Sequence, residues 1–159
     1  MKKLTLVISL LFSICTFGQF EIPARPNPPR LVNDFAKVLT QEQVVALERK
    51  LVAYDDSTSN QIVVVTIKST NGDDIEEVAL GFLRKWQPGQ KDKNNGIVVL
   101  AAIDDHKVWI STGYGMEGVV PDITAKAIID EDILPNFRSS DYYRGFDQGT
   151  TSIMKAAAG

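Results

Sequence analysis

The 159-residue sequence contains one cysteine and one histidine, and its acidic residues slightly outnumber its basic residues. The cysteine, Cys15, stands near the N-terminus, so the rest of the chain has no disulfide bonds and relies on a hydrophobic core. With 17 Lys and Arg against 20 Asp and Glu, the chain lacks the cationic excess that gives nucleic-acid binders their affinity for phosphates. The length predicts one globular domain, and the charge balance predicts no nucleic-acid partner.

The first eighteen residues have the pattern of a secretory signal peptide. Two lysines precede an almost wholly apolar run, Leu4 to Cys15, of about a dozen residues, which is too short for a membrane-spanning helix. Thr16-Phe17-Gly18 then places small residues at the −3 and −1 positions of a cleavage site. We therefore expect a periplasmic or secreted chain that begins at Gln19 and has no transmembrane segment.

Cys15 has a second interpretation as a lipid-attachment site, although Ile14 before it is bulky where such sites favour a small residue. Cleavage after Gly18 would remove Cys15 and two lysines, which takes the formal net charge from −3 to −5. The mature protein would then have no cysteine available for catalysis.

The rest of the sequence divides into a lead-in and one domain. Residues 19–30 hold four of the seven prolines, which predicts an extended segment because proline cannot donate to a sheet. Residues 31–159 alternate between helical and strand patterns, without an internal repeat. They are expected to form the folded domain.

The elements of the domain follow from hydrophobic periodicity and capping signals. Continuous apolar runs at 62–67 and 97–103 predict strands buried on both faces, and the alternating run 107–112 predicts an antiparallel strand after the hairpin turn 104–106. The first helix is predicted over 41–54, with a Thr40/Gln43 capping box at its start. A second helix begins after a cap at Asp73 or Asp74 and runs to Trp86. A third covers 121–134 and ends at Pro135, and a last helix begins at about Asp141. The order α-β-α-β-β-α-α predicts an α/β fold, a three-layer α/β/α sandwich around a small mixed sheet.

Two familiar kinds of site are excluded by context. The stretch Gly113–Gly118 matches G-x-G-x-x-G, but no strand follows its helix to complete a dinucleotide-binding unit, so no nucleotide cofactor is predicted. His106, the only histidine, lies in a polar turn and lacks the orienting partner that nucleophilic catalysis requires. No catalytic residue is assigned.

Carboxylates in loops or at element ends are the remaining candidates, namely Asp34, Asp104, Asp105, Glu117 and Asp122. Hard cations such as Ca²⁺ prefer several oxygen ligands of this kind. Each residue also has a structural alternative: Asp34 as an Asx-turn residue, Asp104 and Asp105 as turn formers, and Asp122 as a helix cap. Spacing alone does not choose between these roles.

Several motifs in fixed order resemble the TPM domain family over about residues 28–157. They are Val32-Asn33-Asp34-Phe35-Ala36, Asn95-Gly96, Gly113-Tyr114-Gly115-Met116-Glu117-Gly118, Pro121-Asp122, Pro135-Asn136-Phe137-Arg138, Asp141-Tyr142 and Gly145. The resemblance implies an α/β/α sandwich, binding of a divalent metal (mainly calcium) and an acid phosphatase activity in some members, including a thylakoid-lumen phosphatase implicated in photosystem II repair. Many members carry C-terminal transmembrane helices, whereas this chain ends at Gly159, so a stand-alone exported version is expected.

The resemblance implies Asp34, Glu117 and Asp122 as metal ligands, with Asp104 and Asp105 as a second choice and Mg²⁺ as an alternative to Ca²⁺. If the segment 31–38 extended along the sheet, Asp34 would reach the end that holds the 113–118 loop. Arg138 is the candidate for binding phosphate.

Three functions are carried forward. The first is a calcium-binding module of the cell envelope that assembles or maintains other proteins, and the second is a metal-dependent acid phosphatase, in which a bound cation activates water. The third is a purely structural interaction domain without metal. The expected partner is an envelope protein or a phosphorylated substrate, and the chain is expected to be a monomer.

Overall fold

The computed structural model describes residues 18–159. The predicted signal peptide and Cys15 therefore lie outside the described residues, apart from Gly18. The strands are β1 (Val32–Asp34), β2 (Gln61–Ile67), β3 (Gly96–Ala102) and β4 (Lys107–Thr112), and the helices are α1 (Gln41–Thr58), α2 (Ile75–Trp86), α3 (Asp122–Ile128), α4 (Leu134–Arg138) and α5 (Tyr142–Ala158).

The four strands form one mixed sheet in the order β1-β2-β3-β4. β1, β2 and β3 are parallel, and β4 is antiparallel to β3. Apart from Gln61, every residue of the inner strands β2 and β3 is buried, as their continuous apolar sequences predicted.

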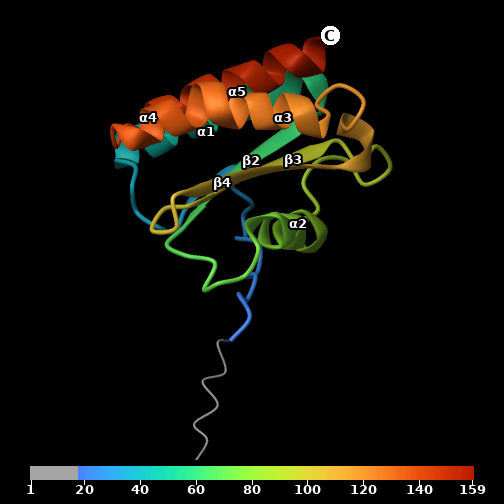
Figure 1. The fold of residues 1–159 in the computed structure, drawn as a ribbon. Coiled ribbons are helices and arrows are strands. Elements are labelled where there is room, and N and C mark those ends of the chain that lie inside the picture. The colour runs from blue at the N-terminus through green and yellow to red at the C-terminus, as the bar shows by residue number, and fades with distance from the viewer. Residues whose placement is uncertain (1–17) are drawn as a thin grey trace, which may run out of the picture.

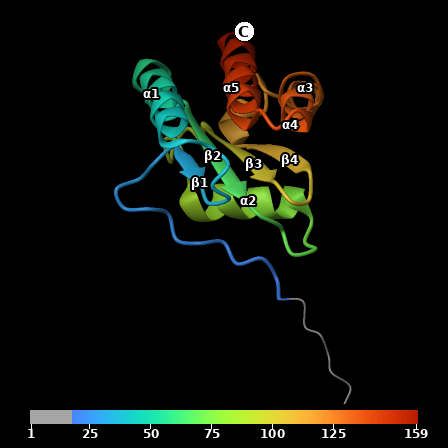
Figure 2. The same ribbon diagram turned by 90° about the vertical axis from the view of Figure 1, so that its left-hand side faces the viewer.

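The helices cover both faces of this sheet, which confirms the predicted three-layer α/β/α architecture. Figures 1 and 2 show α2 alone below the sheet, and α1, α5 and the α3–α4 segment above it. The hydrophobic core lies on both sides of β2 and β3, with Phe82 of α2 and Phe146 of α5 fully buried on opposite sides. This arrangement leaves only β1 and β4 as sheet edges.

The loops after β1 and β2 leave the sheet toward opposite faces. The crossovers β1-α1-β2 and β2-α2-β3 each move to the next strand in the same direction, but α1 and α2 lie on different faces (Figure 2). The two crossovers therefore have opposite hands, although right-handed crossovers are the strong rule. Loops that part at the carboxyl ends of parallel strands create the position where α/β sheets commonly bind ligands.

One strand and one helix end differ from the sequence prediction. β1 was not predicted as a strand, because three residues are too few to show a periodic pattern. α1 continues to Thr58, four residues beyond the predicted end at Tyr54. The prediction stopped early because the last turn is polar and adds nothing to the apolar periodicity. Ser59 ends the helix with a positive φ of 64°. The Thr40/Gln43 capping box at its start is confirmed.

The expected helix end at Pro135 is wrong. A π-helical turn, Ile129–Ile133, joins α3 to α4, and the helical path continues through Pro135 to Arg138. Proline normally ends a helix because its ring meets the carbonyl four residues earlier and it has no N–H to donate. The wider π turn relieves this conflict, and the Asn136 side chain donates to the Asp132 carbonyl oxygen at 2.7 Å.

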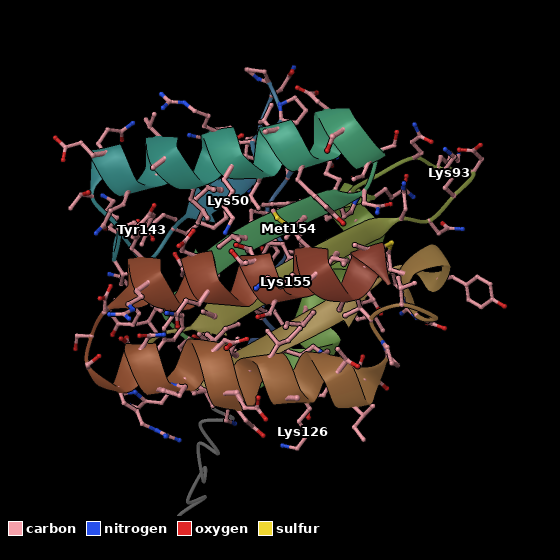
Figure 3. All side chains as sticks on the ribbon, turned by 90° about the horizontal axis from the view of Figure 1, so that it is seen from above. Lys50, Lys93, Lys126, Tyr143, Met154 and Lys155 are labelled. Atoms are coloured by element: carbon pink, nitrogen blue, oxygen red, sulfur yellow. The ribbon has the colours of Figure 1, made fainter. Side chains whose placement is uncertain are left out.

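Lys50 links α1 to α5 on the upper face. Figure 3 shows it between the two helices, and its Nζ donates to Asp147 Oδ1 at 2.9 Å and to Thr151 Oγ1 at 2.6 Å. Its side chain is 26% exposed, so the ion pair with Asp147 is partly shielded from water. These contacts hold α1 and α5 side by side on the upper face of the sheet.

The proline-rich segment 19–30 packs against α2. The Phe20 ring lies 6.1 Å from that of Phe82, and the Trp86 indole N–H donates to the Pro23 carbonyl oxygen at 2.8 Å. The Arg25 guanidinium donates to the Trp86 carbonyl oxygen at 2.9 Å. The lead-in thus completes the packing of the lower layer.

Candidate functional site

Asp34 lies at the carboxyl end of β1, opposite Thr66 of β2. Its Oδ1 accepts hydrogen bonds from the Thr66 hydroxyl at 2.6 Å and the Val38 N–H at 3.1 Å, and its Oδ2 accepts one from the Leu39 N–H at 2.9 Å. Since a carboxylate has about four acceptor positions, most of this side chain is already used. Asp34 therefore holds the turn between β1 and α1, which is the structural alternative considered for it.

Glu117 lies at the other end of the sheet. β4 is antiparallel to β3, so the loop after Thr112 stands beside the start of β3 at Gly96 and Ile97. That end is about 15–20 Å from Asp34, given the rise of the intervening strand residues. The Glu117 side chain is exposed and borders a surface hollow that Arg84 and Lys91 also line.

The glycines of the 113–118 loop serve the contact between two loops. A Cβ on Gly113 would lie 2.3 Å from the Asn94 carbonyl oxygen, and one on Gly115 would lie 2.0 Å from that of Lys93. The backbone of the preceding loop thus occupies the space that side chains would need. Carbonyl groups of the protein itself therefore fill the space beside these two glycines.

Asp122 occupies a third position, as the exposed first residue of α3. It borders a groove between α3 and β4. The expectation that Asp34 would join Glu117 and Asp122 at one end of the sheet is therefore wrong, because β1 runs parallel to β2 and stops after three residues. Within residues 18–159, no group of three or more His, Cys, Asp or Glu side chains is close enough to hold a metal ion. The three residues implied by the resemblance do not fit one metal site.

The second-choice carboxylates lie at the same end as Asp34, in the hairpin after β3. Asp105 accepts hydrogen bonds from the Thr70 N–H at 2.8 Å and the Ser69 hydroxyl at 2.9 Å. The Thr70 N–H is the main cause that lowers the pKa of Asp105 below its ordinary value, with Ser69 and Lys107 adding to the effect. Asp105 is therefore held ionised beside the exposed Asp104.

A cationic cavity adjoins this hairpin. It has a volume of about 130 Å³; four apolar residues line one part of it, and the polar part is lined by His106, Lys107, Arg138 and Tyr142. Arg138, the phosphate candidate, thus shares a cavity with two residues that were not assigned to a site. No sequence pattern indicates this grouping, because His106 and Arg138 come together only through the path of α3 and α4 across the sheet.

This end of the sheet combines two kinds of ligand chemistry. Arg138 and Lys107 can donate charge-assisted hydrogen bonds to an anion. Asp104 and Asp105 can supply oxygen ligands to a hard cation, which backbone carbonyl groups or water would have to complete. The carboxyl ends of the parallel strands are therefore the candidate functional end.

Together these features define a class of protein: a three-layer α/β/α domain with a mixed four-stranded sheet and charged loops at the carboxyl ends of its parallel strands. The family model described as TPM domain matches residues 32–156. The chain belongs to the TPM domain family.

Solved structures agree with this assignment. The N-terminal domain of a protein from P. gingivalis is 32% identical to this chain with a TM-score of 0.74, and the match covers 80% of this chain and 81% of that one. The N-terminal domain of a Corynebacterium glutamicum protein is 14% identical (TM-score 0.65, coverage 89% of both chains), and a protein of the psychrophilic bacterium Bizionia argentinensis is 21% identical (TM-score 0.67, coverage 78% and 84%). The last two show the fold alone. No curated protein matches the chain.

Among the helices of residues 18–159, none has the length and apolar character needed to cross a membrane.

Proposed function

We propose that this chain is a TPM-domain binding module of the cell envelope, which binds a divalent cation, calcium rather than magnesium, and assists the assembly or maintenance of other proteins. The family resemblance motivates the cation. The observation that supports a site is the ionised Asp105, held by Ser69 and Thr70 next to Asp104 at the carboxyl ends of the parallel strands. The cation would take Asp104 and Asp105 as its protein carboxylates.

A calcium titration of the mature chain, followed residue by residue in NMR spectra, tests this proposal. We expect the amide signals of Ser69, Thr70, Asp104 and Asp105 to shift, and the melting temperature to rise, because binding to the folded state alone adds about 2.7 kcal/mol at a hundredfold excess over Kd. Asp104→Asn should weaken binding, and Glu117→Gln should leave it unchanged. Shifts confined to residues 113–122 would instead locate the cation at the other end of the sheet.

The alternative is a metal-dependent acid phosphatase, favoured by one observation: Arg138, Lys107 and His106 line one cavity beside the hairpin carboxylates. These residues would bind and orient a phosphoryl group, while a bound cation would supply Lewis-acid assistance. Hydrolysis of p-nitrophenyl phosphate by the purified protein should then fall at least tenfold in Arg138→Ala and remain in Arg144→Ala. Turnover that survives Arg138→Ala would belong to a contaminant or to another site.

A further inference from the structure

The outer edge of β4 has backbone groups that no strand of the described residues pairs with. The Gly113 N–H donates to the Gly96 carbonyl oxygen at 2.7 Å, which sets the register of the β3–β4 pair. Because backbone groups alternate in direction along a strand, Val108, Ile110 and Thr112 direct their N–H and C=O groups away from β3. No strand lies beyond β4 in the sheet formed by the described residues, so these outward groups have no strand partner there.

A groove follows this edge and is walled by both helix layers. Ile75 of α2 lines it from below, Ala125 and Ile129 line it from above, and Trp109 lies along it; its volume is about 340 Å³. Figure 2 shows the α3–α4 segment above β4 at the outer side of the sheet. A strand added here would lie between apolar groove residues above and below it, which is the arrangement needed for β-strand addition.

The charges at the two ends of the groove differ. The α3–α4 segment runs antiparallel to β4 (Figure 1), so Asp122 lies toward the end of β4 and Arg138 toward its start. His106, Lys107 and Leu134 line both this groove and the cationic cavity, so the two adjoin each other. A strand that pairs antiparallel to β4 would bring its carboxyl terminus to Lys107 and Arg138, and its amino-terminal side to Asp122.

We propose that the β4 edge binds the C-terminal segment of another protein, as an extended strand antiparallel to β4 with its free carboxylate in the cavity of Lys107 and Arg138. Main-chain hydrogen bonds to Val108, Ile110 and Thr112 supply affinity for any extended chain. The apolar walls select apolar side chains, and the cationic cavity selects a chain that ends there. This inference requires neither cation binding nor phosphatase activity, although the alternative phosphatase would use the same cavity of Lys107 and Arg138.

The test uses the mature chain, a chelator and the hexapeptide Ac-KTVTVV with either a free or an amidated C-terminus. We expect the free acid to shift the NMR signals of Val108, Ile110 and Thr112 and to slow hydrogen exchange of their amides. Amidation should weaken binding roughly tenfold, the ratio expected for losing one charge-assisted hydrogen bond. Because a chelator is present, failure of the calcium proposal does not affect this result.

Matched variants separate the strand edge from the cavity. Thr112→Pro removes one outward N–H and should weaken both peptides, whereas Thr112→Val keeps that N–H and should not. Arg138→Ala should weaken only the free acid, with Arg144→Ala as the control. The proposal is overturned if acid and amide bind equally, if the β4 amides do not respond, or if the edge is instead occupied by a second copy of the chain in a concentration-dependent dimer.

Discussion

At the scale of single residues, Asp34 shows how one side chain can fit a ligand pattern and yet serve the fold. Its carboxylate accepts three hydrogen bonds from Thr66, Val38 and Leu39, which join β1, β2 and the turn into α1. Asp34 lies at the opposite end of the sheet from Glu117, so repulsion between these two carboxylates does not destabilise the metal-free protein. The cost of removing Asp34 should therefore appear without any cation.

We predict that Asp34→Ala lowers the free energy of unfolding by about 1–3 kcal/mol, the cost of leaving buried or half-buried donors unpaired. The Thr66 hydroxyl and the Val38 N–H would lose their acceptor. Urea unfolding in the presence of a chelator measures the effect. Glu117→Ala, at an exposed position, should change the value by less than about 0.5 kcal/mol. An Asp34→Ala protein as stable as the parent chain would disprove the structural role of this carboxylate.

At the scale of elements, the sequence predicts what is long and periodic. The runs 62–67 and 97–103 carry a continuous apolar signal, and Thr40 and Gln43 mark a helix start by their own chemistry. β1 has three residues and no such signal. The π turn depends on packing around Pro135, which a local pattern does not contain.

The position of Asp34 in the candidate site depends on β1, the strand that the sequence did not predict. Knowing that Asp34 ends a short strand parallel to β2 places it at the same end of the sheet as the 104–106 hairpin, and at the opposite end from Glu117. Arg138 was selected from its motif, but its companions His106 and Lys107 follow only from tertiary structure. Residue types were thus accessible from the sequence, whereas their grouping required the direction of β1 and the path of α3 and α4.

Gly145 illustrates the packing between α4 and α5. In a helix interior, replacing glycine by alanine normally stabilises by up to about 1 kcal/mol. Here a Cβ would lie 2.5 Å from the Phe137 ring and 3.1 Å from the Ile133 carbonyl oxygen. The close approach of the two helices, and not backbone freedom, requires glycine at this position.

We predict that Gly145→Ala destabilises the protein by about 1–3 kcal/mol, because the clash with Phe137 forces the helices apart. Thermal unfolding followed by circular dichroism measures the change. The matched control is Gly81→Ala in α2, where the Cβ would meet only the flexible end of the Ile22 side chain at 3.0 Å and the loss should be smaller. A more stable Gly145→Ala protein would show that α4 moves aside without cost.

At the scale of the whole molecule, the two faces of the sheet are covered unequally. The upper face has four helices over it, whereas α2 alone covers the lower face (Figures 1 and 2). The lead-in supplies the missing cover: the Phe20 N–H donates to Asp73 Oδ2 at 2.6 Å, and its ring packs on Phe82. The family match begins only at residue 32, so this cover lies outside it.

The lead-in should therefore count as part of the folded unit. We predict that a chain of residues 31–159 melts about 5–10 °C below one of residues 19–159, because it loses the partial burial of Phe20 and Ile22 against α2 and exposes Phe82 and Trp86. Calorimetry of the two chains measures the difference, and Glu21→Ala in the longer chain, which changes only an exposed side chain, controls for sequence changes within the segment. Phe20→Ala should reproduce part of the loss, since it removes the ring and keeps the backbone bond to Asp73. If the shorter chain melts at the same temperature, α2 closes the lower face by itself and residues 19–30 act only as a tether.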